Sequence, residues 1–138
     1  MDASIAISQT RPSADAVNRL YDLVGWNASG LRTVAKTQKA LDLSLCTVTA
    51  KFGDKFVGFG RIIGDAYTAQ ILDLMTHPDY RRQGIASSVL DELLRYAKGK
   101  FLGIYLIDGS SIEGFYEKHN FILANPETDK LMYLPEDV

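Results

Sequence analysis

Hydrophobic and polar residues follow two different periods along the chain, and these periods predict both strands and helices. Residues 3–10, ASIAISQT, alternate small or apolar residues with polar ones, which predicts a short strand. Beyond RPS, apolar residues recur at the i, i+3, i+4 and i+7 spacing of a buried helical stripe: Val17, Leu20, Tyr21 and Val24. Ser13 can cap this helix and Gly25 can end it, and a second, weaker helix is predicted around residues 31–41.

From Leu45 onward the period shortens to that of strands. LCTVTAKF and KFVGFGRII flank Gly53-Asp54, a pair of residues typical of a tight antiparallel hairpin. TAQILDLMT is a third strand with apolar residues on both faces, which predicts a central strand covered on both sides. KFLGIYLID is predicted as a further buried strand, and KLMYLP as the last strand.

Two helices are predicted between these later strands. Within HPDYRRQGIASSVLDELLRYAKG, apolar residues are spaced by four: Ile85, Val89, Leu93 and Ala97. A short helix can start at Ser110 or Ser111, with Ile112, Phe115 and Tyr116 on one face, and Asn120 can end it. A strand, a helix and a strand over residues 68–107 imply a parallel crossover. The predicted fold class is therefore α/β or α+β, with a mixed, mostly antiparallel central sheet and helices on both faces.

Composition limits the classes of function. A chain of 138 residues with 46% hydrophobic content predicts one compact domain over residues 1–138. Fifteen Lys and Arg against 17 Asp and Glu give a net charge of -2, which disfavours a nucleic-acid binder. The one cysteine, Cys46, makes neither a disulfide framework nor a Cys-rich metal site, and it reads as a small buried hydrophobe. Without a secretory signal or a membrane-length apolar run, a cytoplasmic location without membrane contact is expected.

The segment RRQGIA indicates an anion site. It connects a predicted strand to the start of a predicted helix, where backbone N–H groups are free and the positive end of the helix dipole lies. Gly84 and Ala86 would let a phosphate approach the backbone, and Arg81 and Arg82 can add charge-assisted hydrogen bonds, so a pyrophosphate fits better than a lone carboxylate. In the alternative interpretation, Gly84 only turns the chain and the arginines are solvated. Neither a P-loop nor a GxGxxG motif is present.

Two segments resemble the GCN5-related N-acetyltransferase (GNAT) superfamily. HPDYRRQGIASSVLDELL is similar to its acetyl-CoA signature [Q/R]xxGx[G/A], which Arg81, Gly84 and Ala86 fill. FYEKHNF, residues 115–121, is similar to the family's FYEKLGF helix at the expected distance. Asn120 stands where the family has glycine, and it tolerates the same backbone region. The predicted order of elements also resembles the family fold from Ile5 to Leu134.

The resemblance implies an enzyme that transfers the acetyl group of acetyl-CoA, as co-substrate and without a metal, directly to an amine. By similarity, the backbone of Leu74, Met75 and Thr76 would pair with the pantetheine arm, and one of these amides would polarise the thioester carbonyl. The amides of Arg82 to Ala86 would bind the pyrophosphate. The full set of residues expected to bind the co-substrate is Leu74, Met75, Thr76, Arg81, Arg82, Gln83, Gly84, Ile85, Ala86, Ser87, Phe115 and Tyr116.

Two residues are candidates for catalysis. Tyr116 matches the family tyrosine that protonates the departing thiolate, and a phenol of pKa ~10 can donate to a thiolate whose conjugate acid has a pKa of about 8.5. In the alternative interpretation, Tyr116 is a core aromatic. Asp73 is the one carboxylate in the central strand, and it must be paired or hydrated. It can bind the acceptor amine, act as general base or hold a neighbouring loop.

The family builds its acceptor site from the first two helices and the central strands, which makes Trp26, Arg32, Arg61 and Asp73 candidates for binding the substrate. Trp26 can equally be a lid over the core. We expect a small primary amine as acceptor. The alternatives are a protein N-terminus or lysine and a non-catalytic module that senses acyl-CoA, and a homodimer is compatible with the family.

Overall fold

A computed structural model describes residues 5–110 and 112–135. The described chain divides into two compact units, one ending at Leu106 and the other beginning at Ile107. The expectation of a single domain over residues 1–138 stays a prediction.

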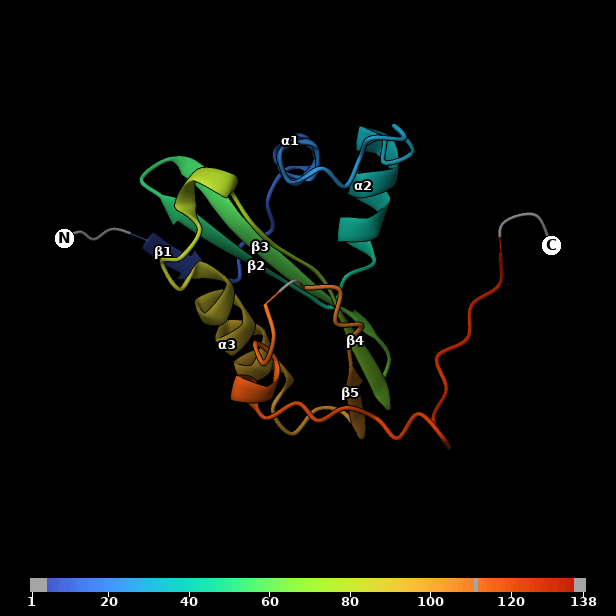
Figure 1. The fold of residues 1–138 in the computed structure, drawn as a ribbon. Helices are drawn as coiled ribbons and strands as arrows, with labels where there is room; N and C mark the ends of the chain where they lie inside the picture. The colour runs from blue at the N-terminus through green and yellow to red at the C-terminus, as the bar shows by residue number, and fades with distance from the viewer. Residues whose placement is uncertain (1–4, 111, 136–138) are drawn as a thin grey trace. The chain divides into compact units, whose positions relative to one another are not determined.

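The first unit is built on a five-stranded sheet in the order β1-β2-β3-β4-β5 (Figure 1). The strands span Ile5–Ser8 (β1), Cys46–Phe52 (β2), Lys55–Gly64 (β3), Thr68–Thr76 (β4) and Gly103–Tyr105 (β5). The first four strands pair antiparallel, and β5 pairs parallel with β4. This confirms the predicted mixed sheet and the hairpin at Gly53-Asp54. Residues 3 and 4 of the first predicted strand lie outside the described residues.

Three α-helices accompany the sheet: α1 (Ala14–Val24), α2 (Val34–Asp42) and α3 (Ile85–Ala97). The predicted ends of α1 are confirmed, because Ser13 Oγ accepts a hydrogen bond from Ala16 N at 3.1 Å and Gly25 is left-handed with φ 84°. Thr33 caps α2 in the same way through Lys36 N at 3.2 Å. All three predicted helices are therefore present, and the two ends predicted for α1 are those observed.

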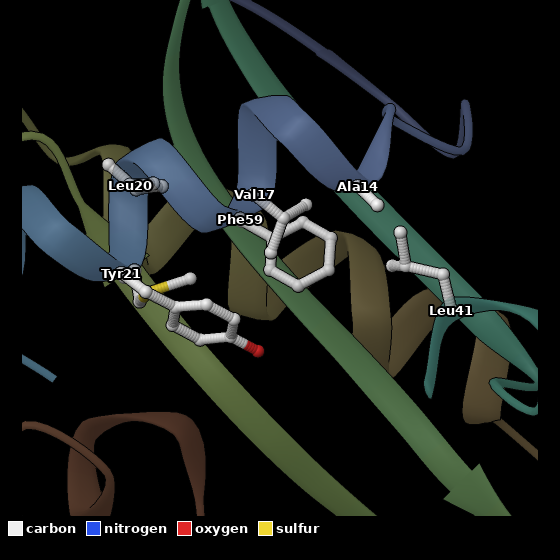
Figure 2. Packing of buried hydrophobic residues seen from close by; sticks show 7 residues of the cluster. Ala14, Val17, Leu20, Tyr21, Leu41 and Phe59 are labelled. Carbon is white, nitrogen blue, oxygen red and sulfur yellow. The ribbon is translucent and has the colours of Figure 1, made fainter. Parts of the chain in front are cut away.

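Helices cover both faces of the sheet, as predicted. On one face, α1 and α2 pack on β3 and β4 in a buried cluster (Figure 2): Ala14, Val17, Leu20, Tyr21, Leu41, Phe59 and Met75. On the other face, α3 packs against the backbone of β3. A Cβ atom on Gly58 would lie 2.6 Å from Ile85 Cγ2, and one on Gly60 would lie 2.8 Å from Leu93 Cδ1. The alternating sides of β3 thus meet different helices, as the period of a strand requires.

Strand β5 differs from its prediction. It spans three residues and lies next to β4 only at Thr68, Ala69 and Gln70. Tyr105 is 63% exposed, so the predicted long buried strand over residues 100–108 is wrong in both length and burial. The apolar run set the prediction, whereas the length of a strand depends on the neighbour with which it pairs.

The second unit contains a 3-10 helix, η2 (Glu117–His119), and turns. The predicted short helix is present only as this 3-10 segment, and Ile112, Phe115 and Tyr116 lie in the bend and turn that precede it. Ser110 does not cap it, because its Oγ donates to Asp108 Oδ1 at 2.7 Å. Ser111, the other predicted cap, lies outside the described residues. Asn120 ends the segment in the left-handed conformation with φ 72°, as predicted. The described residues 130–135 form no strand, so the prediction of a last strand there is also wrong.

Candidate functional site

The chain leaves β4 and enters α3 through a tight connection. A 3-10 turn, η1 (Pro78–Tyr80), follows β4, and the buried His77 caps it by accepting a hydrogen bond from Asp79 N on Nδ1 at 3.1 Å. Arg82 and Gly84 are both left-handed, with φ 66° and 76°. These reversals bring residues 81–84 to the start of α3, and the backbone N–H groups of the first helical turn point toward that end.

The start of α3 has the properties of an anion site. Gly84 is its N-cap, and no described side chain caps the helix through a hydrogen bond. Arg81 and Arg82 are exposed, and neither makes an ion pair with another residue in the described part of the chain. A Cβ atom on Gly84 would meet nothing within 4 Å, so the backbone faces open space there. The helix dipole and two uncompensated cations together favour a negatively charged group at this place.

Strand β4 carries a bulge at Asp73 and Leu74. Phe59 pairs with Met75 and Arg61 pairs with Leu72, so a single residue of β3 faces two residues of β4 at this point. Asp73 is left-handed, with φ 59°, which is unusual for a residue with a side chain. A bulge bends the strand and turns backbone groups out of the regular ladder.

Around this bulge, one edge of β4 has no partner strand in the described part of the chain. Strand β5 accompanies β4 only as far as Gln70, and no described strand pairs with residues 71–76 on that side. Leu74, Met75 and Thr76 lie on this open edge, and the anion site at residues 81–87 follows within the same unit. An extended molecule with amide groups can bind such an edge as an additional strand does.

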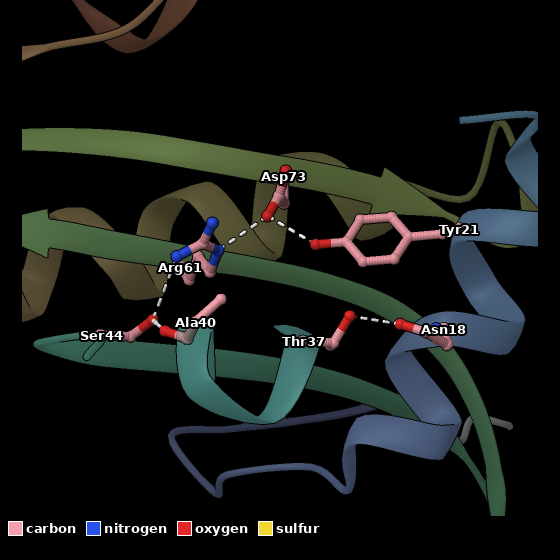
Figure 3. Close-up of polar contacts among 7 residues, drawn as sticks. All are labelled: Asn18, Tyr21, Thr37, Ala40, Ser44, Arg61 and Asp73. Carbon is pink, nitrogen blue, oxygen red and sulfur yellow. Dashed lines mark hydrogen bonds and ion pairs between the residues drawn. The ribbon is translucent and has the colours of Figure 1, made fainter. Parts of the chain in front are cut away.

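A partly buried polar cluster surrounds the bulge on the side of α1 and α2 (Figure 3). The Oδ2 atom of Asp73 accepts hydrogen bonds from Arg61 Nε at 2.7 Å and from the Tyr21 hydroxyl at 2.8 Å. Arg61 also approaches Ser44 Oγ at 3.4 Å, and Ser44 Oγ donates to the Ala40 carbonyl at 2.8 Å. The side chains of Asp73 and Arg61 are 12% and 14% exposed, so the pair is largely removed from water.

The two other predicted acceptor residues lie next to this cluster. Arg32 Nη1 donates to the Trp26 carbonyl at 2.8 Å, and its guanidinium group lies 4.8 Å from the centre of the Tyr21 ring. The Tyr21 and Trp26 rings are 6.5 Å apart, and the Trp26 side chain is 43% exposed. Trp26, Arg32, Arg61 and Asp73 are therefore brought together, and Tyr21 connects them.

Tyr21 is the functional candidate that the sequence analysis missed. Its position on the apolar stripe of α1 predicted a core residue, and the ring is indeed buried in the α1 cluster. Its hydroxyl, however, reaches Asp73. Burial, followed by the carboxylate of Asp73, raises the pKa of Tyr21 to about 12, so this phenol stays protonated and donates. The available signal was that a buried tyrosine hydroxyl needs a partner, as does a carboxylate in an apolar strand.

Tyr116 and Phe115 belong to the second unit. The Tyr116 ring packs edge-on against Phe115 and Phe121, with ring centres 5.0 and 6.0 Å apart. Burial, and then the Asp108 carboxylate, raise the pKa of the Tyr116 phenol above its usual value. The raised pKa keeps the phenol protonated at neutral pH, although it also weakens its tendency to release the proton. The roles of both residues stay predictions.

The first unit fits acetyl-CoA in two respects. The Arg81–Ser87 segment offers cations, a helix terminus and open space at Gly84 for a pyrophosphate. The open edge of β4 offers backbone groups to an extended arm. Among the described residues, no group of three or more His, Cys, Asp or Glu side chains could hold a metal ion. No helix of the described chain is long and apolar enough to cross a bilayer.

Comparison with known proteins adds a family assignment to this geometry. A family model described as "Acetyltransferase (GNAT) domain" matches residues 44–123, which include β2, β3, β4, α3, β5 and the FYEKHNF segment. Among solved structures, a probable acetyltransferase from meticillin-resistant Staphylococcus aureus superposes with a TM-score of 0.83. It is 24% identical, and the match covers 95% of this chain and 98% of that one, so it shows the same fold.

Curated relatives are longer than this chain. The "Uncharacterized N-acetyltransferase ycf52" of Pyropia yezoensis is 28% identical over 85% of this chain and 68% of its own length. Two plant proteins are each 29% identical over 83% of this chain: "Histone acetyltransferase TAP1" of Glycine max and "GCN5-related N-acetyltransferase 2, chloroplastic" of Arabidopsis thaliana. The chain spans about half the length of these two plant proteins, 53% and 51%.

Proposed function

The chain belongs to the GNAT acetyltransferase family, and from this premise we propose that it transfers the acetyl group of acetyl-CoA to a primary amine of a small molecule. The observation that carries the proposal is that two surfaces of the first unit, one suited to an extended arm and one to an anion, follow each other along the chain. The open edge of β4 leads through one short turn into the exposed, uncapped start of α3. An extended arm on that edge would place its pyrophosphate at residues 81–87.

The reaction needs two contributions from the chain, a group that stabilises the carbonyl oxygen and a proton donor. The amine nitrogen attacks the thioester carbonyl carbon, the carbon–nitrogen bond forms, and the carbon–sulfur bond breaks with its electron pair leaving on sulfur. A backbone amide among Leu74, Met75 and Thr76 would stabilise the negative charge that develops on the carbonyl oxygen. The nitrogen would release its proton to water, Tyr116 is the proposed donor of a proton to the thiolate, and the Tyr116 phenolate would then be reprotonated from solvent. The products are an acetamide and free coenzyme A.

The acceptor would bind on the α1 and α2 side of the bulge, near Trp26, Arg32 and the Asp73–Arg61 pair. These side chains surround Tyr21 closely, which favours an amine of a few atoms with a second polar group for Arg32. A protein amine is the second candidate, because one relative at 29% identity is named a histone acetyltransferase. The proposed compartment is the cytoplasm, and the chloroplastic name of the Arabidopsis relative makes a plastid the alternative to test by fractionation.

Binding and turnover test the proposal separately. Acetyl-CoA would be titrated into the purified chain by calorimetry, and thiol release would then be followed over small primary amines and over peptides with a free N-terminus or lysine. Binding with turnover on one small amine supports the proposal. Turnover on peptides alone favours the protein acceptor, binding without turnover on either panel favours the sensor, and absence of binding rejects the assignment of residues 81–87.

A further inference from the structure

We propose that Tyr21 and Arg61 are positioning residues that hold the bulge of β4 through Asp73, and that Asp73 is an anchor for this bulge and not the general base. The proposal rests on the proposed function, because the bulge carries the amides that would face the thioester carbonyl. It assigns to α1 a role in the reaction that the apolar pattern of this helix does not indicate.

The backbone of the bulge needs support. Asp73 has φ 59°, and a residue with a side chain adopts this conformation only where its surroundings stabilise it. The bulge has a strand neighbour on the β3 side, whereas residues 71–76 have none on the β5 side in the described part of the chain. The strand is therefore held at its most strained residue by one neighbour and by its own side-chain contacts.

Those contacts come from two other elements, β3 and α1. Arg61 is on β3, and its Nε lies 2.7 Å from Asp73 Oδ2. Tyr21 is on α1, and its hydroxyl lies 2.8 Å from the same oxygen. Arg61 is in turn oriented by Ser44, whose hydroxyl donates to the carbonyl of Ala40 on α2. Two donors on one buried carboxylate oxygen fix the direction of the Asp73 side chain, and with it the backbone to which it is attached (Figure 3).

The same contacts argue against Asp73 as a base. The Oδ2 atom of Asp73 already accepts hydrogen bonds from Arg61 Nε and from the Tyr21 hydroxyl. A base that took up a proton at this oxygen would have to break and remake a contact that holds the bulge in each catalytic cycle. As an anchor, Asp73 keeps both hydrogen bonds throughout, and the amides of the bulge stay where negative charge develops on the carbonyl oxygen.

Tyr21→Phe tests the proposal, because it removes the hydroxyl donor and keeps the ring in the core. We expect kcat and kcat/KM to fall together by about tenfold to a hundredfold, since displacement of a catalytic group by a fraction of an ångström has this effect. The Kd for acetyl-CoA and the acidic limb of the pH profile should stay the same. Arg61→Lys should lower kcat similarly, and the double variant should lose less than the product of the two effects.

The matched control is Thr37→Val. The Thr37 hydroxyl bonds to Asn18 Oδ1 between α2 and α1, so this variant also removes a buried polar contact of α1 but leaves β4 untouched. Its kcat should equal that of the wild type. The proposal is wrong if Tyr21→Phe lowers kcat no more than Thr37→Val does. It is also wrong if Tyr21→Phe shifts the acidic limb of the pH profile, as it would if Asp73 were the general base.

A second measurement is independent of turnover. In two-dimensional NMR spectra with assigned backbone amides, Tyr21→Phe should shift the signals of residues 72–76, and Thr37→Val should not. Absence of these shifts overturns the positioning role, even if the enzyme is active. Their presence in a protein that acetylates no amine supports the anchor and rejects the proposed function, so the two failures are distinguishable.

Discussion

Gly84 and Gly99 lie at the two ends of α3 in nearly the same left-handed conformation, with φ 76° and 74°, and a Cβ atom on either would meet nothing within 4 Å. They differ in what surrounds them. Gly84 begins the helix beside Arg81 and Arg82, whereas Gly99 follows its last turn. Substitution of each glycine in turn therefore distinguishes destabilisation by backbone strain, expected at both, from loss of anion binding, expected at Gly84 alone.

Gly84→Val and Gly99→Val should each destabilise the fold by about 1–2 kcal/mol, because a β-branched residue is strained at this φ. Gly84→Val alone should also weaken acetyl-CoA binding, since its side chain would occupy the space through which a phosphate approaches the backbone. Calorimetric titration of both variants, with urea unfolding in parallel, checks this. Equal affinities in the two variants would show that the pyrophosphate does not bind at residue 84.

Arg82→Gly should weaken acetyl-CoA binding without destabilising the fold, whereas Gly99→Val should destabilise the fold without weakening binding. Arg82 is left-handed with φ 66°, a conformation that glycine adopts without strain, so the free energy of unfolding should stay the same or rise by up to about 1 kcal/mol. The affinity for acetyl-CoA should fall by roughly fivefold, as for the loss of one exposed ion pair, and depend less on salt. Arg19→Ala, which removes an exposed arginine of α1, is the control. Unchanged affinity in Arg82→Gly would exclude a contact with the phosphates.

Tyr116→Phe should lower kcat by about a hundredfold, the low end of the usual contribution of a general acid, and leave the Kd for acetyl-CoA within about twofold. Because the pKa of Tyr116 is raised, its titration should not reduce the activity of the wild type below about pH 10. Tyr133→Phe changes an exposed tyrosine of the same unit and should have no effect. Wild-type turnover by Tyr116→Phe at all pH values would remove Tyr116 from the mechanism.

The Tyr21 phenol should make stability fall at high pH. Its pKa is about 12 in the folded chain, raised by burial and by Asp73, against about 10 in an unfolded chain, so the folded state holds this proton more tightly. The resulting stabilisation is complete below pH 10 and is lost as pH rises toward 12. Urea unfolding of the wild type and Tyr21→Phe at several pH values should show their difference shrinking over this interval. A constant difference would contradict the assigned pKa.

The sequence predicts most helices and the first four strands, because their signals are local. The i, i+3, i+4 stripe of α1, its cap at Ser13 and the turn at Gly53-Asp54 each depend on a few neighbouring residues. The family motif in RRQGIA likewise lies within one short segment. These features survive folding because the tertiary structure reinforces the local preference.

The bulge at Asp73, the short β5 and the Tyr21 hydroxyl bond are not local. A bulge is a mismatch in register between two strands, and neither Arg61 nor Leu72 alone encodes it. The pairing of β5 with β4 ends at Gln70 and Tyr105, a limit set by the partner strand that the apolar run around Ile104 cannot indicate. Tyr21 and Asp73 are 52 residues apart in the chain, and their spacing carries no signal. The sequence did indicate that a carboxylate in an apolar strand must be paired or hydrated, and in the structure Asp73 is paired.

The open edge of β4 between residues 71 and 76 also bears on how the protein behaves at high concentration. Unpaired backbone groups of an extended strand are the usual point at which one molecule associates with another and aggregation begins. A substrate that lies along this edge would shield it, and by mass action it would raise the melting temperature in proportion to the logarithm of its concentration. If acetyl-CoA binds as proposed, it would thus protect the chain from association, and the folded protein should be most soluble when this ligand is abundant.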